Sequence, residues 1–307
     1  MDHFGPSALT IGNFDGVHAG HREILQRVVE LARERGWKPS VLTFDPHPAR
    51  IVAPERAPRL LTTPEERARL MRAEGIEQVL ILPFTPELAA FTPERFVREI
   101  VVERLEARAV LVGDNFRFGH EHAGDTRLLA ELGRQYGFLV EALPAIRMRG
   151  RVVSSSEVRR LIDAGNVALA GRLLERPYAL TGEVVSGQGI GSKQTVPTLN
   201  LAPAAEVLPA RGVYITRTGD LEAGRRWNSV TNIGTRPTFG GDSVTVETFL
   251  LDPLEGASPR AIRVEFLRRL REERRFADAA SLKQQILRDV GRAQTYFRRV
   301  SRIGGHL

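Results

Sequence analysis

Short apolar runs alternate with amphipathic segments through the first half of the chain. Residues 8–12 and 40–44 are short runs rich in branched apolar side chains, which is typical of buried strands. Between them, residues 21–36 repeat apolar positions at helical spacing and end on a glycine. The alternation predicts a parallel sheet with helices on both faces. It continues through expected helices at 63–75, 92–105 and 125–137 and expected strands at 78–84, 107–113 and 138–146.

The pattern changes near Pro177, after a last helical region at 156–176. Beyond it, short runs rich in Val, Thr, Ile and Tyr are separated by Gly, Pro and Asn, which is typical of a small antiparallel barrel or sandwich. Residues 278–300 then form an amphipathic pattern that predicts a terminal helix. We therefore expect an α/β domain over residues 1–178 and an antiparallel β-barrel domain over residues 179–307.

Composition and charge narrow the possible chemistry. The 307 residues include no cysteine, which excludes disulfides, thiolate metal sites and cysteine nucleophiles. The net charge of +7 suggests polyanionic partners, although an arginine-rich composition beside many carboxylates also accounts for it. The sequence shows no cluster of aromatic residues interleaved with basic ones, so we expect no nucleic-acid partner. It also shows no signal peptide and no long apolar stretch, so we expect a cytoplasmic protein with no membrane partner.

A glycine-rich turn at residues 12–21 joins the first strand to the first helix. Glycines allow tight turns and close approach of the backbone to a ligand. The helix begins near Gly20, so its free N–H groups and positive dipole end favour an anion at this turn. His18 and His21 are three residues apart and share one face of a helical turn, where both can donate hydrogen bonds to phosphate oxygens. The turn is therefore a candidate phosphate site.

The spacing of the glycines and histidines can be compared with that of other phosphate-binding motifs and of metal sites. It has neither the Gly-Lys-Ser/Thr of a P-loop nor the glycine arrangement of a dinucleotide-binding motif. Two histidines and one aspartate could bind zinc, although no HExxH pattern lies nearby. A glycine-rich turn with incidental surface histidines is the remaining alternative.

The segment GNFDGVHAGH, residues 12–21, resembles the HxGH signature of the nucleotidyltransferase superfamily. Its longer form is similar to that of the bacterial bifunctional riboflavin kinase/FMN adenylyltransferases, also called FAD synthetases. Three further segments resemble motifs of the same family, namely TFDPHP at 43–48, VGDNFRFG at 112–119 and SSSEVRRLI at 154–162. With the barrel-like second half, the resemblance extends over nearly the whole chain.

The resemblance implies an N-terminal Rossmann-like domain that transfers an adenylyl group from ATP to FMN. Such a reaction needs two polyanions to be positioned and neutralised, because the FMN phosphate is itself the nucleophile. Asp15 could also orient a histidine or a metal-bound water. The resemblance assigns His18 and His21 to catalysis, Gly12, Asn13, Asp15, Gly20, Ser155, Ser156 and Arg159 to ATP and its phosphates, and Asn115 and Phe116 to flavin binding.

The second half resembles riboflavin kinase in its Pro-Thr-x-Asn motif at residues 197–200. The resemblance implies that Thr198 and Asn200 hold Mg²⁺, which prefers oxygen ligands. It also makes Glu247 the general base that takes the proton of the ribityl 5′-hydroxyl. The loop departs from the family pattern where Ser192 replaces an arginine, and Lys193 is expected to supply the lost charge to ATP.

Together these features predict a bifunctional enzyme with ATP, riboflavin, FMN and FAD as substrates and products and Mg²⁺ as cofactor. Two alternatives stay open at this point. One is a monofunctional FMN adenylyltransferase with a degenerate flavin-binding kinase domain. The other is an HxGH nucleotidyltransferase with a non-flavin acceptor.

Overall fold

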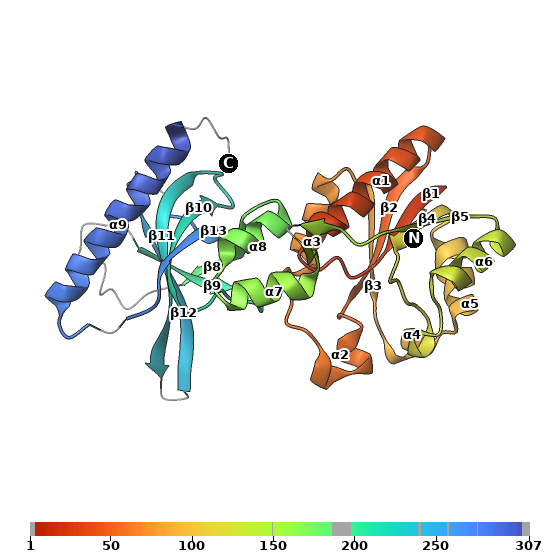
Figure 1. Cartoon of the computed structure of the whole chain (residues 1–307), viewed down its shortest axis with the longest axis horizontal. Helices are drawn as coiled ribbons and strands as arrows, with labels where there is room; N and C mark the ends of the chain where they lie inside the picture. The colour runs from red at the N-terminus through yellow and green to blue at the C-terminus, as the bar shows by residue number, and fades with distance from the viewer. Residues whose placement is uncertain are drawn as a thin grey trace. The chain divides into compact units, whose positions relative to one another are not determined.

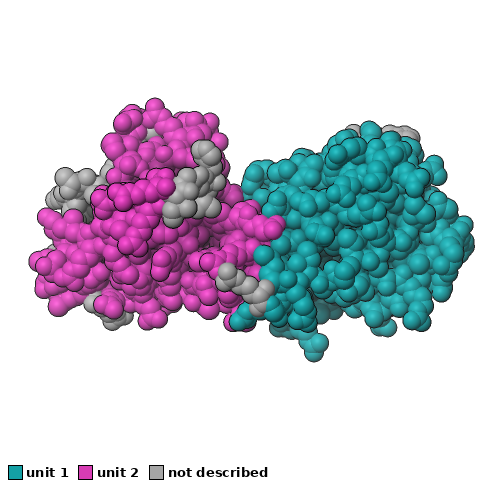
Figure 2. All heavy atoms as spheres, turned by 45° about the horizontal axis from the view of Figure 1, so that its top comes forward, with its two compact units in different colours: residues 1–155 teal, residues 156–307 magenta. Residues whose placement is uncertain are grey.

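The structure is a computed structural model that describes residues 4–148, 150–185, 198–238, 241–256, 258–274 and 276–302. The chain forms two compact units, residues 1–155 and residues 156–307 (Figure 2). The predicted domain boundary near residue 178 lies after this division, and it stays a prediction.

A five-stranded parallel sheet forms the centre of the first unit, with strand order β3-β2-β1-β4-β5 (Figure 1). All five residues of the central strand β1 are buried, which is why its sequence has no polar face toward solvent. The predicted parallel sheet is thereby confirmed. Its strands are β1 (Ser7–Ile11), β2 (Lys38–Asp45), β3 (Gln78–Pro83), β4 (Ala107–Gly113) and β5 (Leu139–Leu143).

Helices cover both faces of this sheet. One face packs against α1 and α3 through a core that includes Leu25 and Met71. The other face packs against a π-helix and α6 through a core that includes Val101 and Leu129. The helices of this unit are α1 (Ala19–Arg35), α2 (Ala49–Val52), η1 (Pro54–Arg56), α3 (Pro64–Ala73), α4 (Pro86–Ala89), α5 (Pro93–Phe96), the π-helix η2 (Val97–Arg104), η3 (His120–His122) and α6 (Thr126–Tyr136).

The strand order places a topological switch point at the carboxyl end of β1. β2 lies on one side of β1 and β4 lies on the other, so the chain runs in opposite directions across the sheet from this point. In open α/β sheets, ligands bind in the crevice outside the carboxyl ends of the strands at such a point. The turn that follows β1 and the loop that follows β4 flank it, and both carry predicted site residues.

A closed antiparallel barrel dominates the second unit, in the order β10-β11-β12-β9-β8-β13. Alternating side chains point into the barrel, where Tyr214 and Phe266 are both buried. The six strands close on themselves, which confirms the predicted barrel. A closed sheet leaves no exposed strand edge. Its strands are β8 (Tyr178–Val185), β9 (Thr198–Pro203), β10 (Gly212–Asp220), β11 (Arg226–Thr238), β12 (Gly241–Leu250) and β13 (Ala261–Arg271).

The predicted terminal helix is α9 (Ala279–Arg302), which lies along the outside of the barrel (Figure 1). Its residues Ala293 and Phe297 pack on Val213 and Val230 of the neighbouring strands β10 and β11. A buried ion pair between Arg271 and Asp289, 2.8 Å apart, joins the helix to the end of β13. The outer face of β10 and β11 is therefore partly covered by an apolar helix face.

Two expected helices differ in detail from the structure. The expected helix at 92–105 is a short α-helix followed by the π-helix, and the expected helical region at 156–176 is two helices, α7 (Ser155–Asp163) and α8 (Val167–Leu174). Gly165 has a φ of 74° between them, a left-handed backbone that ends a helix readily. A small hairpin, β6 (Arg147–Met148) and β7 (Arg151–Val152), precedes α7. Among the described residues, no helix has the length and apolar character needed to cross a membrane.

Candidate functional sites

The two histidines of the glycine-rich turn lie against each other at the start of α1. His18 is the N-cap residue of this helix, and its Nδ1 accepts a hydrogen bond from the backbone N–H of His21 at 3.3 Å. The two imidazole rings are stacked, with their centroids 3.6 Å apart and their planes 16° apart. The capping bond therefore sets the orientation of one ring, and stacking sets the orientation of the second relative to it.

Gly20 and Phe14 fit closely around this pair. A Cβ atom at position 20 would lie 3.3 Å from the His18 ring, so glycine gives the ring room to fold over the first turn of α1. The ring of Phe14 meets that of His21 edge-on, with centroids 5.0 Å apart. Phe14 is itself buried, so it supports His21 from the core side. The predicted turn thus has a packed, defined geometry at a helix N-terminus, where an anion is favoured.

Asp15 connects the turn to a distant segment of the chain. Its buried carboxylate accepts hydrogen bonds from the backbone N–H groups of Leu61 and Thr62 at 2.9 and 3.1 Å. The hydroxyl of Thr62 also donates to Asp15, and it accepts a bond from the N–H of Gly16 at 3.1 Å. These contacts make Asp15 part of the support of the turn, and its predicted role toward ATP stays a prediction.

The Ser154–Ser156 segment reaches the same turn through Ser155. The hydroxyl of Ser155 donates a hydrogen bond of 2.9 Å to the backbone carbonyl of Asp15. Ser156 and Arg159 belong to the second unit. There, a guanidinium nitrogen of Arg159 donates a hydrogen bond of 3.4 Å to the hydroxyl oxygen of Ser156. Their predicted contact with nucleotide phosphates stays a prediction.

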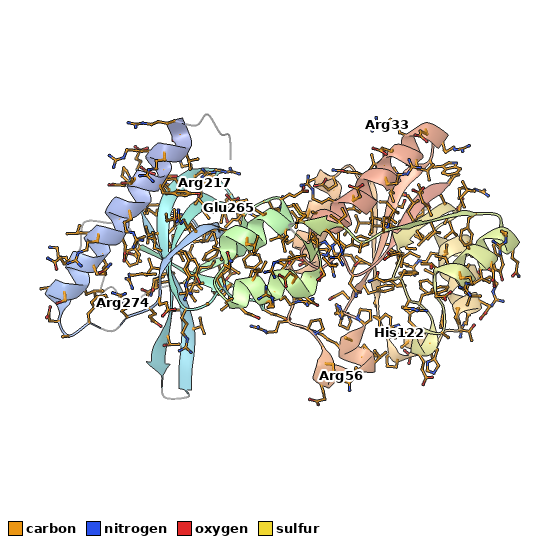
Figure 3. The ribbon with its side chains drawn as sticks, viewed as in Figure 1. Arg33, Arg56, His122, Arg217, Glu265 and Arg274 are labelled. Carbon is orange, nitrogen blue, oxygen red and sulfur yellow. The ribbon has the colours of Figure 1, made fainter. Side chains whose placement is uncertain are left out.

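The predicted flavin residues lie in the loop after β4, whose His122 is labelled in Figure 3. The backbone N–H of Phe116 donates to the carbonyl of Gly113 at 3.0 Å, which turns the chain directly after the strand. The rings of Phe116 and Phe118 are stacked with centroids 5.6 Å apart, and Phe118 is buried. Asn115 and Phe116 therefore lie on an ordered turn at the same sheet edge as the histidines.

The predicted kinase residues share one outer surface of the barrel. In the strand register, Glu247 of β12 lies directly opposite Asn200 of β9, and Phe249 lies opposite Thr198. The residues that flank Glu247 in sequence, Val246 and Thr248, are buried inside the barrel, so Glu247 faces outward. Opposed residues of antiparallel strands have Cβ atoms about 5 Å apart. The barrel thereby assembles Thr198, Asn200 and Glu247, while Lys193 lies outside the described residues.

The sequence analysis missed a further polar residue in this row. Asn232 of β11 lies opposite Glu247 on its other side, so a row of three polar residues crosses three neighbouring strands. The Nδ2 of Asn232 and the Oε1 of Glu273 both lie close to Gly234, at 3.0 and 2.5 Å from where a Cβ atom would stand. The sequence signal was weak, because Asn232 lies in a segment that mixes polar and apolar residues.

Arg67 and Thr62 are also missing from the predicted set. Both contact the glycine-rich turn from the segment that begins α3, about fifty residues along the chain. Nothing in their local sequence indicates this, because a helical arginine is normally solvent-exposed.

Metal binding by the histidine pair finds no support in the described part of the chain. No group of three or more His, Cys, Asp or Glu side chains there is arranged to hold a metal ion. Thr198 and Asn200 are a different kind of candidate from the histidines. Their side chains carry uncharged oxygen atoms, which suit Mg²⁺, a hard cation that keeps most of its waters.

Two protein families match this chain, each over a different stretch. The FAD synthetase family matches residues 2–157, and the riboflavin kinase family matches residues 174–297. The chain is 38% identical to the bifunctional riboflavin kinase/FMN adenylyltransferase of Escherichia coli strain K12, over 94% of this chain and 92% of that one. It is 39% identical to the protein of the same name from Pseudomonas fluorescens, over 93% and 91% of the two chains.

One solved structure is similar over nearly the same length. A crystal structure described as a macrolide-efflux protein from Streptococcus pneumoniae has a TM-score of 0.85 and 25% sequence identity, with 94% of each chain covered. This likeness concerns the fold, and the activity in that description is stated of the other protein.

Proposed function

The chain belongs to the family of bifunctional riboflavin kinase/FMN adenylyltransferases, and from this premise we propose that it makes FAD from riboflavin in two steps. The second unit transfers the γ-phosphoryl group of ATP to riboflavin and releases ADP. The first unit transfers the adenylyl group of a second ATP to the resulting FMN and releases pyrophosphate. The observation that carries this proposal is that each family match falls on a separate fold with its own cluster of polar side chains.

In the proposed adenylyl transfer, a phosphate oxygen of FMN attacks the α-phosphorus of ATP and the bond to pyrophosphate breaks. No proton has to leave the nucleophile, so the protein's task is to position two polyanions and to stabilise the charge that develops on pyrophosphate. His18 and His21 carry hydrogen-bond donors at the positive end of α1, which suits this task. Asn115 and Phe116, in the loop after β4, are proposed to bind the flavin.

In the proposed phosphorylation, the ribityl 5′-hydroxyl attacks the γ-phosphorus of ATP and loses its proton to Glu247. The opposed positions of Glu247 and Asn200 support this assignment, because the base must reach the hydroxyl that attacks the γ-phosphate, and the proposed metal ligand must lie near that same phosphate. Thr198 and Asn200 would hold Mg²⁺, which neutralises charge on the transferred phosphoryl group when it is bound. Lys193 is proposed to add a positive charge to the same phosphates.

Substrates and location complete the proposal. ATP, riboflavin and FMN are the proposed substrates, with FAD as the end product and Mg²⁺ as the metal. A cytoplasmic location is part of the proposal, and cell fractionation with an antibody to the chain would test it.

Chromatography of flavins tests the two activities separately. Purified protein is incubated with ATP and Mg²⁺ and supplied with riboflavin in one reaction and with FMN in the other. Both activities predict FMN followed by FAD from riboflavin, and FAD from FMN. FAD from the FMN-supplied reaction alone would contradict the kinase assignment, and no FAD from either would contradict the adenylyltransferase assignment.

A further inference from the structure

Arg67, on α3, is a buried arginine beneath the histidine turn. Only 1% of its surface is exposed. One guanidinium nitrogen donates a hydrogen bond of 2.7 Å to the carbonyl of Asn13, and the other donates one of 3.1 Å to the carbonyl of Phe44. Asn13 follows β1, and Phe44 lies at the end of β2. A single planar group thus bridges the carboxyl ends of two neighbouring strands.

A buried guanidinium is costly to keep. Removing a charge from water costs several kcal/mol unless nearby groups compensate it. Burial lowers the pKa of Arg67, while the negative charges of Asp15 and Asp45 act in the opposite direction. Its Nε has no hydrogen-bond partner among the described residues, so the donors of the fork are not fully used. The two carbonyl hydrogen bonds and the charges of Asp15 and Asp45 offset part of this cost.

The turn that Arg67 contacts has an unfavourable backbone. Phe14 and Val17 have φ angles of 49° and 39°, in the left-handed region that side chains with a Cβ rarely adopt. Such residues cost about 1–3 kcal/mol each and persist only where the surroundings hold them in place. The anchors of this turn include the bonds of Asp15 to Leu61 and Thr62 and the bond of Arg67 to Asn13.

The carbonyl of Asn13 is the point where these constraints meet. It accepts bonds from both Arg67 and the hydroxyl of Thr43, the latter at 3.3 Å. Without Arg67, this carbonyl and the buried one of Phe44 lose a charged donor. The strained turn that ends in His18 and His21 then loses one of the contacts that hold its backbone.

We propose that Arg67 is a positioning residue for adenylyl transfer, which holds the histidine turn in its reactive shape through the carbonyls of Asn13 and Phe44. This inference rests on the proposed adenylyltransferase function of the first unit. Arg67 acts through the turn, and no contact of its own with substrate is required. Because the effect depends on a planar fork spanning two carbonyls, a lysine cannot replace it fully.

The test compares Arg67→Lys and Arg67→Ala with the control Arg69→Ala. Arg69 lies on the same helix, and its guanidinium pairs with Glu66 at the surface. We expect kcat for FAD formation from FMN to fall about 100-fold in Arg67→Ala, because a small misplacement of reacting groups has effects of that size. Arg67→Lys keeps the charge without the fork, and we expect a fall of about tenfold. Arg69→Ala should keep the wild-type rate.

Three further measurements separate positioning from loss of folded protein. The number of ATP molecules bound per chain, measured by calorimetry below the melting temperature, should equal that of the wild-type protein. Added guanidinium ion, at millimolar concentration, should restore part of the rate to Arg67→Ala and none to Arg69→Ala. Riboflavin kinase activity of the same preparations should be unchanged.

Two results would overturn the inference. One is wild-type kcat in both Arg67 variants. The other is a rate that falls only in proportion to the fraction of folded sites and does not respond to guanidinium ion. Failure of the wild-type protein to convert FMN to FAD would instead refute the proposed function, so the two failures are distinguishable.

Discussion

Glu247 on β12 and Asn200 on β9 lie directly opposite each other in the register of the barrel, although 47 positions separate them in the sequence. Their side chains point out of the same face, because Val246 and Thr248 on either side of Glu247 are buried within. Strand pairing thus places the proposed base beside one of the proposed magnesium ligands.

Replacing Glu247 with glutamine should abolish the kinase and spare the adenylyltransferase. The amide keeps the shape of the side chain and removes its capacity to accept a proton, so kcat for FMN formation should fall about 100-fold or more. Parallel assays with riboflavin and with FMN as substrate measure both activities. Glu265→Gln on β13 (Figure 3) is the matched control and should keep both. Unchanged FMN formation in Glu247→Gln would show that another group takes the proton.

Asn232→Ala should weaken the kinase through Glu247. Asn232 lies opposite Glu247 on β11, where its amide can orient the carboxylate, and loss of one such hydrogen bond corresponds to about tenfold in rate. We expect kcat for FMN formation to fall, while the KM for ATP stays nearly constant. Asn228→Ala, on the same strand, serves as control. A loss confined to the KM for ATP would argue against an orienting role.

His21→Ala should impair FAD formation from FMN and leave FMN formation from riboflavin intact. Removing one preorganised donor to a developing anion typically lowers kcat about 100-fold. His21→Gln retains a donor and should recover part of the rate. Rapid-quench measurement of the first turnover separates chemistry from product release, and an unaltered chemical step would contradict the assignment.

Tyr214 should make the barrel sensitive to alkaline pH. Burial raises its pKa to about 12 from an ordinary value of 10.0, despite the nearby charge of Arg269. The unfolded phenol ionises first, so the stability present below about pH 10 is lost progressively as the pH rises toward about 12. Urea unfolding at several pH values, followed by the fluorescence of Trp227 in a Trp37→Phe background, measures this dependence.

In Tyr214→Phe the slope of unfolding free energy against pH in that window should become smaller. The hydrogen bond from the Tyr214 hydroxyl to the carbonyl of Ala210 is lost as well, which lowers the stability at every pH where the folded phenol keeps its proton. Tyr136→Phe in the first unit should leave the slope of the barrel unchanged. An equal slope in wild type and Tyr214→Phe would show that other groups cause the alkaline loss.

Local pattern was sufficient for the main helices and strands and for the two fold types. Buried parallel strands such as β1 carry no charged side chain on either face, and barrel strands alternate between an inner and an outer face, so each pattern is visible in the chain itself. The histidine turn was also predictable, because its residues are neighbours in sequence. The helix that follows directs its positive dipole end at the turn, which favours an anion there. The π-helix after Phe96 was not foreseen, since its apolar spacing resembles that of an ordinary helix.

The sequence by itself therefore determined the alternating α/β unit, the barrel, and the two short motifs that carry the proposed chemistry. Only the tertiary structure decided that Asp15 binds the backbone at Leu61 and Thr62, that Arg67 bridges Asn13 and Phe44, and that Asn232 joins the row of Glu247. The physical reason is the range of the interactions. Helix and strand periods arise from neighbours in the chain, whereas strand register and buried hydrogen bonds join residues that folding alone brings together.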